Sequence, residues 1–293
     1  ASGSILCLDV SAERDDEYNI AVGTDWGEVW RFELGCAWCP ATWELAGGYE
    51  AGVAVYPGWD NSDEDGAGAE FTTVAVTSVA FSPNFEDDDT VLAVTATATE
   101  TYQQTGMWGD VEGWNEQAEG RFTAIEITTA PASIEIGCTG IALPEDYTGY
   151  DDEFLYSWVY VNSAATHGYV FEIDGSSASR ADTNCSSSIN ALQKARHPLL
   201  ASIAMTGEID DGALMVGAAE GECCGGIQVY RTGEWNIDLC CPDWDKASKP
   251  PTGIEDCLVA YSLDGDKAYA ATSGDGRSVY DESAFSVSEI EEV

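Results

Sequence analysis

The sequence predicts an all-β protein, a β-propeller of about five blades that extends over residues 1–293 as a single domain. Three observations predict this fold class: five segments repeat one pattern, apolar strands alternate with turns rich in Gly and Asp, and little of the chain has helical periodicity. The chain stops where a further strand is expected. A fragment of a larger propeller is therefore the alternative.

Each repeat is an acidic turn that leads into an apolar strand, followed by a Gly-containing turn and another strand. The acidic turns open the segments 16–22, 88–94, 151–157, 210–216 and 265–271. Their second positions are residues 17, 89, 152, 211 and 266, so successive repeats are 55 to 72 residues apart. This spacing predicts approximate repeats at 1–50, 72–136, 137–190, 191–250 and 251–293, with residues 101–120 as an insertion. Asp side chains accept hydrogen bonds from nearby backbone N–H groups, so turn formation explains the repeated Asp better than catalysis does.

One repeat has a specific resemblance. Residues 80–85 read Ala-Phe-Ser-Pro-Asn-Phe, and Asp-Asp-Thr-Val follows at 88–91. This segment resembles the repeat of secreted bacterial and archaeal β-propellers, which are similar to sortilin-like and Asp-box propellers and include surface-layer-like proteins. Residues 143–147 with 151–152 form a weaker copy. The resemblance implies a propeller that is exported to the cell surface.

Charge excludes one class of partner. The chain has 53 acidic and 11 basic side chains and a formal net charge of −42. Nucleic acids are polyanions that bind to basic surfaces, so we expect no nucleic-acid partner. The same field attracts divalent cations or a basic protein. No apolar run of about 18 residues is present, so no membrane span is expected.

Cysteine usage predicts disulfide bonds and an extracellular location. An even number of cysteines in a chain with two His favours disulfides over structural zinc. Disulfides persist in oxidising compartments outside the cytoplasm. The disulfide candidates, whose pairing stays open, are Cys7, Cys36, Cys39, Cys138, Cys185, Cys223, Cys224, Cys240, Cys241 and Cys257.

An acidic loop predicts calcium as a cofactor. Residues 61–66 alternate oxygen-bearing side chains and end on Gly66, as calcium loops do. A twelfth-position Glu is missing, because Thr72 stands there. A solvated acidic loop is the alternative. The candidate metal ligands are Asp60, Asn61, Asp63, Asp65 and Glu70.

Several tryptophans lie in sequence typical of loops, near Gly, Pro or acidic residues. Exposed Trp favours contacts with proteins or sugars, whereas buried Trp covers the edge of a core. The interface candidates are Trp59, Trp108, Trp114, Trp235 and Trp244. In contrast, Trp26 and Trp30 lie in predicted strands and are expected in the core.

These observations predict a non-catalytic extracellular structural protein, a surface-layer or filament component that assembles through acidic loops and calcium. Its expected partners are copies of itself, other cell-surface proteins, and glycans. His167 and His197 are the two near-neutral bases, and no GxSxG motif is present, so no enzyme is predicted. The alternative function is a carbohydrate- or protein-binding propeller module. A sialidase-like glycoside hydrolase is third, because the arginines are few and scattered.

Overall fold

The described part of the chain consists mainly of antiparallel β-strands, which confirms the all-β prediction. The structure is a computed structural model. It describes residues 3–13, 17–35, 43–50, 53–54, 58–60, 72–108, 113–115, 124–129, 132, 138–149, 156–163, 167–174, 177–181, 198–219, 227–232, 244–248, 251, 254–262, 265, 267–274 and 287–290. Within these ranges one short helix occurs, α1 (Phe85–Asp88).

Two compact units divide the chain. Unit 1 comprises residues 1–137, 146–157 and 173–178, and unit 2 comprises residues 138–145, 158–172 and 179–293. No helix in the described part of the chain has the length and apolar character needed to cross a bilayer.

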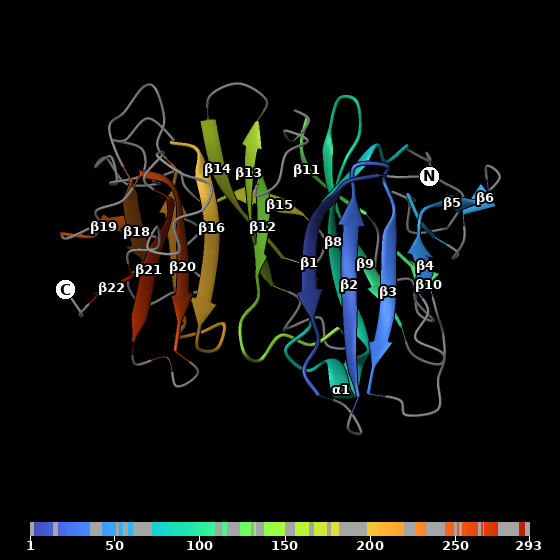
Figure 1. The fold of residues 1–293 in the computed structure, drawn as a ribbon, viewed down its shortest axis with the longest axis horizontal. Coiled ribbons are helices and arrows are strands. Elements are labelled where there is room, and N and C mark those ends of the chain that lie inside the picture. Colours follow the sequence, from blue (N-terminus) through green and yellow to red (C-terminus); the bar gives the residue numbers. More distant parts are fainter. Residues whose placement is uncertain are drawn as a thin grey trace. The chain divides into compact units, whose positions relative to one another are not determined.

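The first sheet of unit 1 has four antiparallel strands in chain order (Figure 1). These strands are β1 (Ile5–Val10), β2 (Tyr18–Thr24), β3 (Val29–Leu34) and β4 (Glu44–Gly47). A short hairpin of β5 (Tyr49–Glu50) and β6 (Val53–Ala54) follows.

The second sheet of unit 1 has the strand order β10-β9-β8-β7, and β11 also pairs with β9. Its strands are β7 (Ala75–Phe81), β8 (Thr90–Ala96), β9 (Thr101–Met107), β10 (Gly113–Trp114) and β11 (Ile125–Thr128). The first part of the predicted insertion 101–120 is therefore wrong, since β9 is a regular strand between β8 and β10. Its polar sequence is buried: Gln104 is 0% exposed and bonded to other side chains.

The two sheets of unit 1 share an apolar core. Ala21, Val29 and Ala46 of the first sheet are fully buried, and Val76 and Val91 of the second sheet belong to the same cluster. Because strand side chains alternate between faces, the other face of the first sheet points away from this core.

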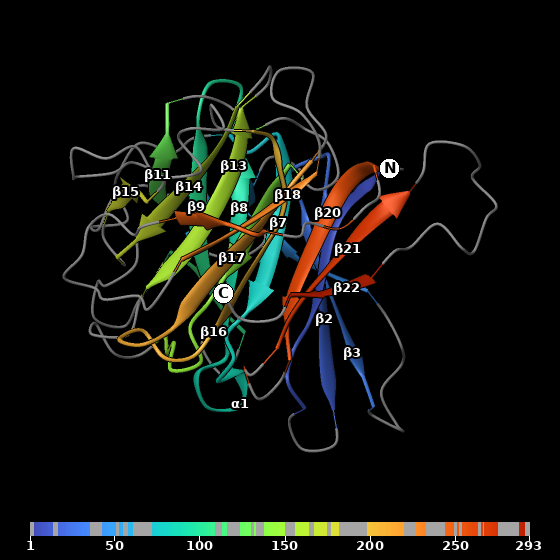
Figure 2. The ribbon, with the colours of Figure 1, turned by 90° about the vertical axis from the view of Figure 1, so that its left-hand side faces the viewer.

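Three further sheets continue the pattern toward the C-terminus. The third contains β12 (Thr139–Ala142), β13 (Ser157–Ser163), β14 (His167–Ile173) and β15 (Ala178–Arg180). The fourth contains β16 (Leu200–Thr206), β17 (Ala213–Ala218), β18 (Gln228–Thr232) and β19 (Trp244–Lys246). The fifth contains β20 (Ile254–Tyr261), β21 (Ala268–Gly274) and β22 (Val287–Ile290), which run side by side in Figure 2.

The acidic turns precede the second strand of each sheet, and Asp88 shows why. Asp88 is 0% exposed, and its carboxylate accepts hydrogen bonds from Ser82 Oγ (2.6 Å), Thr90 N (2.9 Å) and Gly149 N (3.0 Å). Burial raises the pKa of Asp88. Each donor would lack a partner without this side chain. The role of Asp88 is therefore structural.

A bulge recurs in the first strand of four sheets, and a small residue follows it. The pairing register shifts before Cys7, Ser78, Ser202 and Cys257. Two of these side chains reach the next sheet: Cys7 Sγ contacts Val76 O at 3.6 Å, and Ser202 Oγ donates to Cys257 O at 2.8 Å. Either Cys or Ser therefore occupies one repeat position, where a small side chain fits between sheets.

This position accounts for two of the predicted disulfide cysteines. Cys7, Cys138 and Cys257 are thiols, so the disulfide prediction is wrong for these three. Burial raises the pKa of the Cys257 thiol to about 12. The remaining candidates, which lie outside the described residues, are Cys36, Cys39, Cys185, Cys223, Cys224, Cys240 and Cys241.

Candidate functional site

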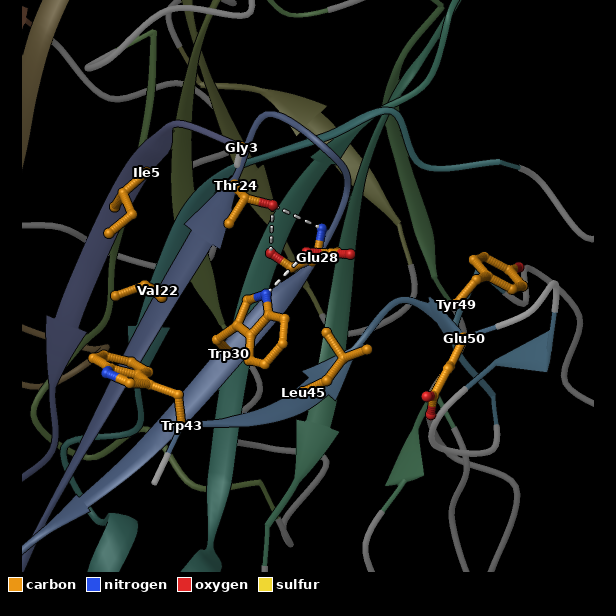
Figure 3. Close-up of a pocket in the computed structure, with 10 residues that line it drawn as sticks. All are labelled: Gly3, Ile5, Val22, Thr24, Glu28, Trp30, Trp43, Leu45, Tyr49 and Glu50. Carbon is orange, nitrogen blue, oxygen red and sulfur yellow. Dashed lines mark hydrogen bonds between the residues drawn. The ribbon is translucent and has the colours of Figure 1, made fainter. Parts of the chain in front are cut away.

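A pocket of about 590 Å³ lies on the outward face of the first sheet in unit 1 (Figure 3). Ligand pockets in proteins commonly have volumes of about 300 to 1,000 Å³. Its lining combines aliphatic, aromatic and acidic side chains: Gly3, Ile5, Val22, Thr24, Glu28, Trp30, Trp43, Leu45, Tyr49 and Glu50. Ile5 and Trp43 lie at one end in Figure 3, and Tyr49 and Glu50 lie at the other.

Strand alternation places these side chains together. Val22 on β2 pairs with Trp30 on β3, which in turn pairs with Leu45 on β4. Their sequence neighbours Ala21, Val29 and Ala46 are buried in the core on the opposite face. Both faces of this sheet are therefore apolar, one inside the core and one lining the pocket.

The outward face carries much of the exposed apolar surface in the described part of the chain. Large hydrophobic residues that are about half exposed or more occur there at Ile5 (53%), Leu8 (64%), Val10 (47%), Leu34 (50%) and Trp43 (47%). A contiguous apolar surface of this kind marks a binding site more often than it marks inert surface.

A hydrogen bond fixes the aromatic floor of the pocket. The indole Nε1 of Trp30 donates to Glu28 Oε2 at 2.9 Å (Figure 3). Glu28 directly precedes β3, and its backbone N–H donates to Thr24 Oγ1 at 3.3 Å. Trp43 packs against Phe32 with ring centroids 5.1 Å apart. Trp30 is thus held beside a carboxylate, and Trp43 is held against Phe32.

A buried polar network supports Tyr49 at the far end. The Tyr49 side chain is hydrogen-bonded to the carboxylate of Asp60. That carboxylate also accepts bonds from Thr73 N (3.0 Å), from Gln104 Nε2 (3.0 Å), and from the Thr73 hydroxyl. Burial nevertheless raises the pKa of Asp60. Asp60 is 0% exposed and therefore holds Tyr49 from beneath the surface.

Asp60 was expected to bind calcium, but the structure gives it other partners. Its oxygens are engaged by Tyr49, Thr73 and Gln104, and a cation would have to displace these donors. The other candidate ligands, Asn61, Asp63, Asp65 and Glu70, lie outside the described residues. Within the described residues, no group of three or more His, Cys, Asp or Glu side chains could hold a metal ion.

The predicted interface tryptophans are mostly interior. Trp59, Trp114 and Trp244 are 2%, 1% and 2% exposed, so the prediction that they form a binding surface is wrong for these three. Trp114 Nε1 donates to Ala46 O at 2.7 Å, and Trp244 Nε1 donates to Ala181 O at 3.1 Å. Trp108 packs partly buried against the core of unit 1. The fifth candidate, Trp235, lies outside the described residues.

Glycine explains why the tryptophans fit inside. A Cβ on Gly47 would lie 2.7 Å from the Trp59 ring, and a Cβ on Gly106 would lie 2.9 Å from the Trp114 ring. Each indole fills the space that a side chain would otherwise occupy. Trp59 and Trp114 also contact each other edge to face, with centroids 4.9 Å apart.

Sequence reasoning assigned Trp30 to the core and did not identify this pocket. The signal was present in the alternation Glu28, Trp30, Phe32, which places one acidic and two aromatic side chains on a single strand face. The opposite face of the same strand has Val29 in the core. The two faces of an apolar strand lie in different surroundings. In β3, one face packs in the core and the other lines the pocket.

Of the two histidines, His167 lies on β14 and stacks on Tyr169 with ring centroids 6.2 Å apart. His197 lies outside the described residues. The described residues that line the pocket supply acceptors and aromatic faces, and none of them has a basic side chain. This combination suits a ligand with an apolar face and hydrogen-bond donors around its rim.

Comparison with known proteins shows the fold. No protein-family model matches the chain, and no curated protein matches it. Among solved structures, the BP39L lectin from Burkholderia pseudomallei has a TM-score of 0.51 at 11% identity, covering 99% of this chain and 67% of that chain. An intramolecular trans-sialidase from Ruminococcus gnavus has a TM-score of 0.48 at 9% identity, covering 90% of this chain and 50% of that chain. A putative glycoside hydrolase from Bacteroides ovatus has a TM-score of 0.44 at 10% identity, covering 99% of this chain and 87% of that chain.

Similar structures also include GH43 glycoside hydrolases and the Dos1 propeller. The chain spans about half the length of several of these proteins, with 46% for one GH43 enzyme and 52% for the Dos1 propeller. These findings support a β-propeller fold. Identities near 10% show the fold alone and assign no activity.

The comparisons contradict the predicted function. The expected surface-layer or filament component without catalytic activity does not agree with neighbours that are mostly glycoside hydrolases and sialidases, together with a lectin. The prediction was motivated by the acidic composition and by the Asp turns, of which Asp88 has a structural role. Neither feature distinguishes an assembly protein from a carbohydrate-binding protein.

Proposed function

We propose that the protein binds carbohydrate in the pocket on the outward face of its first sheet. The observation that carries this proposal is the pairing of aromatic side chains with carboxylates in one pocket: Trp30, Trp43 and Tyr49 with Glu28 and Glu50. A pyranose ring has an apolar face of C–H groups and a rim of hydroxyl donors. Indole faces match the first feature, and carboxylate oxygens accept from the second.

The arrangement of the pocket favours more than one sugar ring. Trp43 lies at one end and Tyr49 at the other, with Trp30 between them (Figure 3). Trp30 is held by Glu28, and Tyr49 is held by the buried Asp60, so both aromatic positions are preorganised. Preorganised contacts reduce the ordering cost of binding. We therefore expect an oligosaccharide of at least two residues to bind better than a monosaccharide.

The similar lectin agrees with this proposal but does not carry it, since the likeness to that structure extends to the fold alone. Two carboxylates in one pocket are also the groups that glycoside hydrolysis requires. The same experiment should therefore include an assay for products of hydrolysis.

The test is a glycan-array screen followed by isothermal titration calorimetry with the oligosaccharide that binds best. Trp43→Ala should weaken binding about tenfold or more, because it removes a half-exposed indole from the pocket. Trp26→Ala is the matched control: Trp26 is 52% exposed, but it lies outside the pocket lining. Equal affinities of wild type and Trp43→Ala, or equal losses in both variants, would contradict the proposal.

An extracellular location and calcium binding by the loop from Asn61 to Glu70 are further proposals. They are supported by the sequence resemblance, the cysteine content and the alternating oxygen side chains of that loop. A melting temperature that rises with calcium and falls with a chelator would support the metal, and indifference to both would contradict it.

A further inference from the structure

The charge of the pocket selects among carbohydrates. Among the described residues, the lining contains the two carboxylates Glu28 and Glu50 and has no Lys, Arg or His. The chain as a whole carries a formal net charge of −42. An anionic sugar, such as a sialic or uronic acid, would be repelled both by the pocket and by the surrounding field.

The nearest cation along the strand does not relieve this charge. Arg31 follows Trp30 on β3, and by alternation it points to the opposite face of the sheet. Its guanidinium pairs with Glu44 at 3.2 Å. The pocket side of the strand therefore keeps the full negative charge of Glu28.

Glu28 is placed to bind a cation next to an aromatic ring. Glu28 Oε2 accepts the hydrogen bond from Trp30 Nε1, whereas Glu28 Oε1 has no hydrogen bond to the described residues. An ammonium group beside this carboxylate would also lie near the Trp30 indole (Figure 3). Carboxylate pairing and cation–π attraction favour the same charge at the same place.

We propose that the pocket prefers amino sugars with a free ammonium group, of the glucosamine type, over neutral sugars, and that it rejects anionic sugars. This inference rests on the proposed carbohydrate function and names the ligand class of that site. In such a complex the sugar ring stacks on an indole, and the ammonium group donates to Glu28. Glu50 provides a second carboxylate at the far end, for a further ammonium group along an oligosaccharide.

The experiment compares three tetrasaccharides by isothermal titration calorimetry: glucosamine tetramer, N-acetylglucosamine tetramer and galacturonic acid tetramer. At about 0.05 M salt, we expect the glucosamine tetramer to bind roughly five- to tenfold more tightly than the N-acetylated tetramer. At about 1 M salt the Debye length falls to about 3 Å, and the preference should shrink. The galacturonic acid tetramer should not bind.

A highly acidic protein also attracts cations without a specific site, so the variants matter. Glu28→Gln keeps an acceptor for Trp30 and should reduce the preference to about twofold. Glu33→Gln is the matched control, because it removes the same charge from β3 at an exposed position whose side chain points to the opposite face. It should leave the preference unchanged. The melting temperatures of both variants should be measured to check that they are folded.

The outcomes separate the two proposals. Failure of all three tetrasaccharides to bind overturns the proposed function and this inference together. Equal binding of the glucosamine and N-acetylated tetramers, with loss of both in Trp43→Ala, overturns the inference and keeps the function. Equal effects of Glu28→Gln and Glu33→Gln, or complete competition by spermidine at equal amine concentration, would show diffuse attraction of cations and also overturn the inference.

Discussion

Packing between the fourth and fifth sheets depends on the absence of a side chain at Gly217. Gly217 pairs with Ser202, the residue that follows the bulge in β16. A Cβ at Gly217 would lie 2.0 Å from the carbonyl oxygen of Cys257 in β20. Ser202 Oγ bonds to that same carbonyl at 2.8 Å and accepts from Val259 N at 2.9 Å. The two sheets therefore meet here through backbone atoms.

Gly217→Ala should destabilise the protein strongly. Real Cβ contacts are essentially never shorter than 3.0 Å, so the two sheets must separate locally by about 1 Å. The obstructing atom belongs to the backbone and cannot rotate away. We therefore expect the free energy of unfolding to fall by about 3 kcal/mol, the upper end of the usual cost of overpacking. At about 2 to 4 °C per kcal/mol, the melting temperature should fall by roughly 6 to 12 °C.

Gly23→Ala is the comparison at the equivalent position of the first sheet. A Cβ there would lie 2.6 Å from Cys7 Sγ and 2.6 Å from Val76 Cγ1, which are both side-chain atoms. These side chains can shift, so the fall in melting temperature should be about half as large as for Gly217→Ala. The assay is thermal unfolding followed by circular dichroism. No fall in melting temperature for Gly217→Ala, or a larger fall for Gly23→Ala, would refute this account of the packing.

Three further predictions concern buried groups. Asp88→Ala should cost about 2 to 4 kcal/mol in chemical unfolding, because three donors lose their acceptor, whereas the exposed Glu86→Ala in the same turn should cost less than about 0.5 kcal/mol. Burial raises the pKa of Asp9 in the folded state, so the folded protein is most stable when Asp9 is protonated, and this stability is lost as the pH rises through that pKa. The variant Asp9→Asn cannot ionise, so its free energy of unfolding should decline less than that of the wild type above about pH 4. Burial raises the pKa of Cys257 to about 12, so iodoacetamide at about pH 8 should label it in the unfolded protein and not in the native protein, as peptide mass spectrometry would show. A larger cost for Glu86→Ala than for Asp88→Ala would contradict the first prediction. The same pH profile for Asp9→Asn and the wild type would contradict the second, and labelling of Cys257 in the native protein would contradict the third.

The sequence was most informative where local patterns determine structure. The acidic segment at 88–94 predicted a turn and a strand, and the structure has Asp88 at the end of the single helical turn α1, with β8 from Thr90 to Ala96. Hydrogen bonding by an Asp side chain to adjacent N–H groups is a local effect, so it can be read from a short segment.

The sequence was less informative where tertiary contacts decide the outcome. Residues 101–120 depart from the repeat and indicated an insertion, but Gln104 of β9 is bonded to Thr95 on the neighbouring strand β8 and to Asp60, 44 residues away. The loop-like surroundings of Trp114 indicated a surface, but Gly106 leaves room for its ring. Cys7 counted toward a disulfide, but it fills the position that Ser202 fills in the fourth sheet. In each case the partner lies in another strand and cannot be identified from local composition.

The pocket shows the same limit in a functional setting. Trp30 and Glu28 are two residues apart, so alternation places them on one face, and this much follows from the sequence. Trp43 and Tyr49 join them only because β4 pairs with β3 and the β5–β6 hairpin follows. The site therefore depends on strand pairing that the repeats indicate only approximately.

A structure of the protein with the tetrasaccharide that binds most tightly tests the central claim most directly. The account predicts electron density for a sugar ring against Trp30 or Trp43, with an oxygen or nitrogen of the sugar within hydrogen-bond distance of the Glu28 carboxylate. Density for the sugar elsewhere on the protein, with the pocket on the first sheet empty, would contradict it.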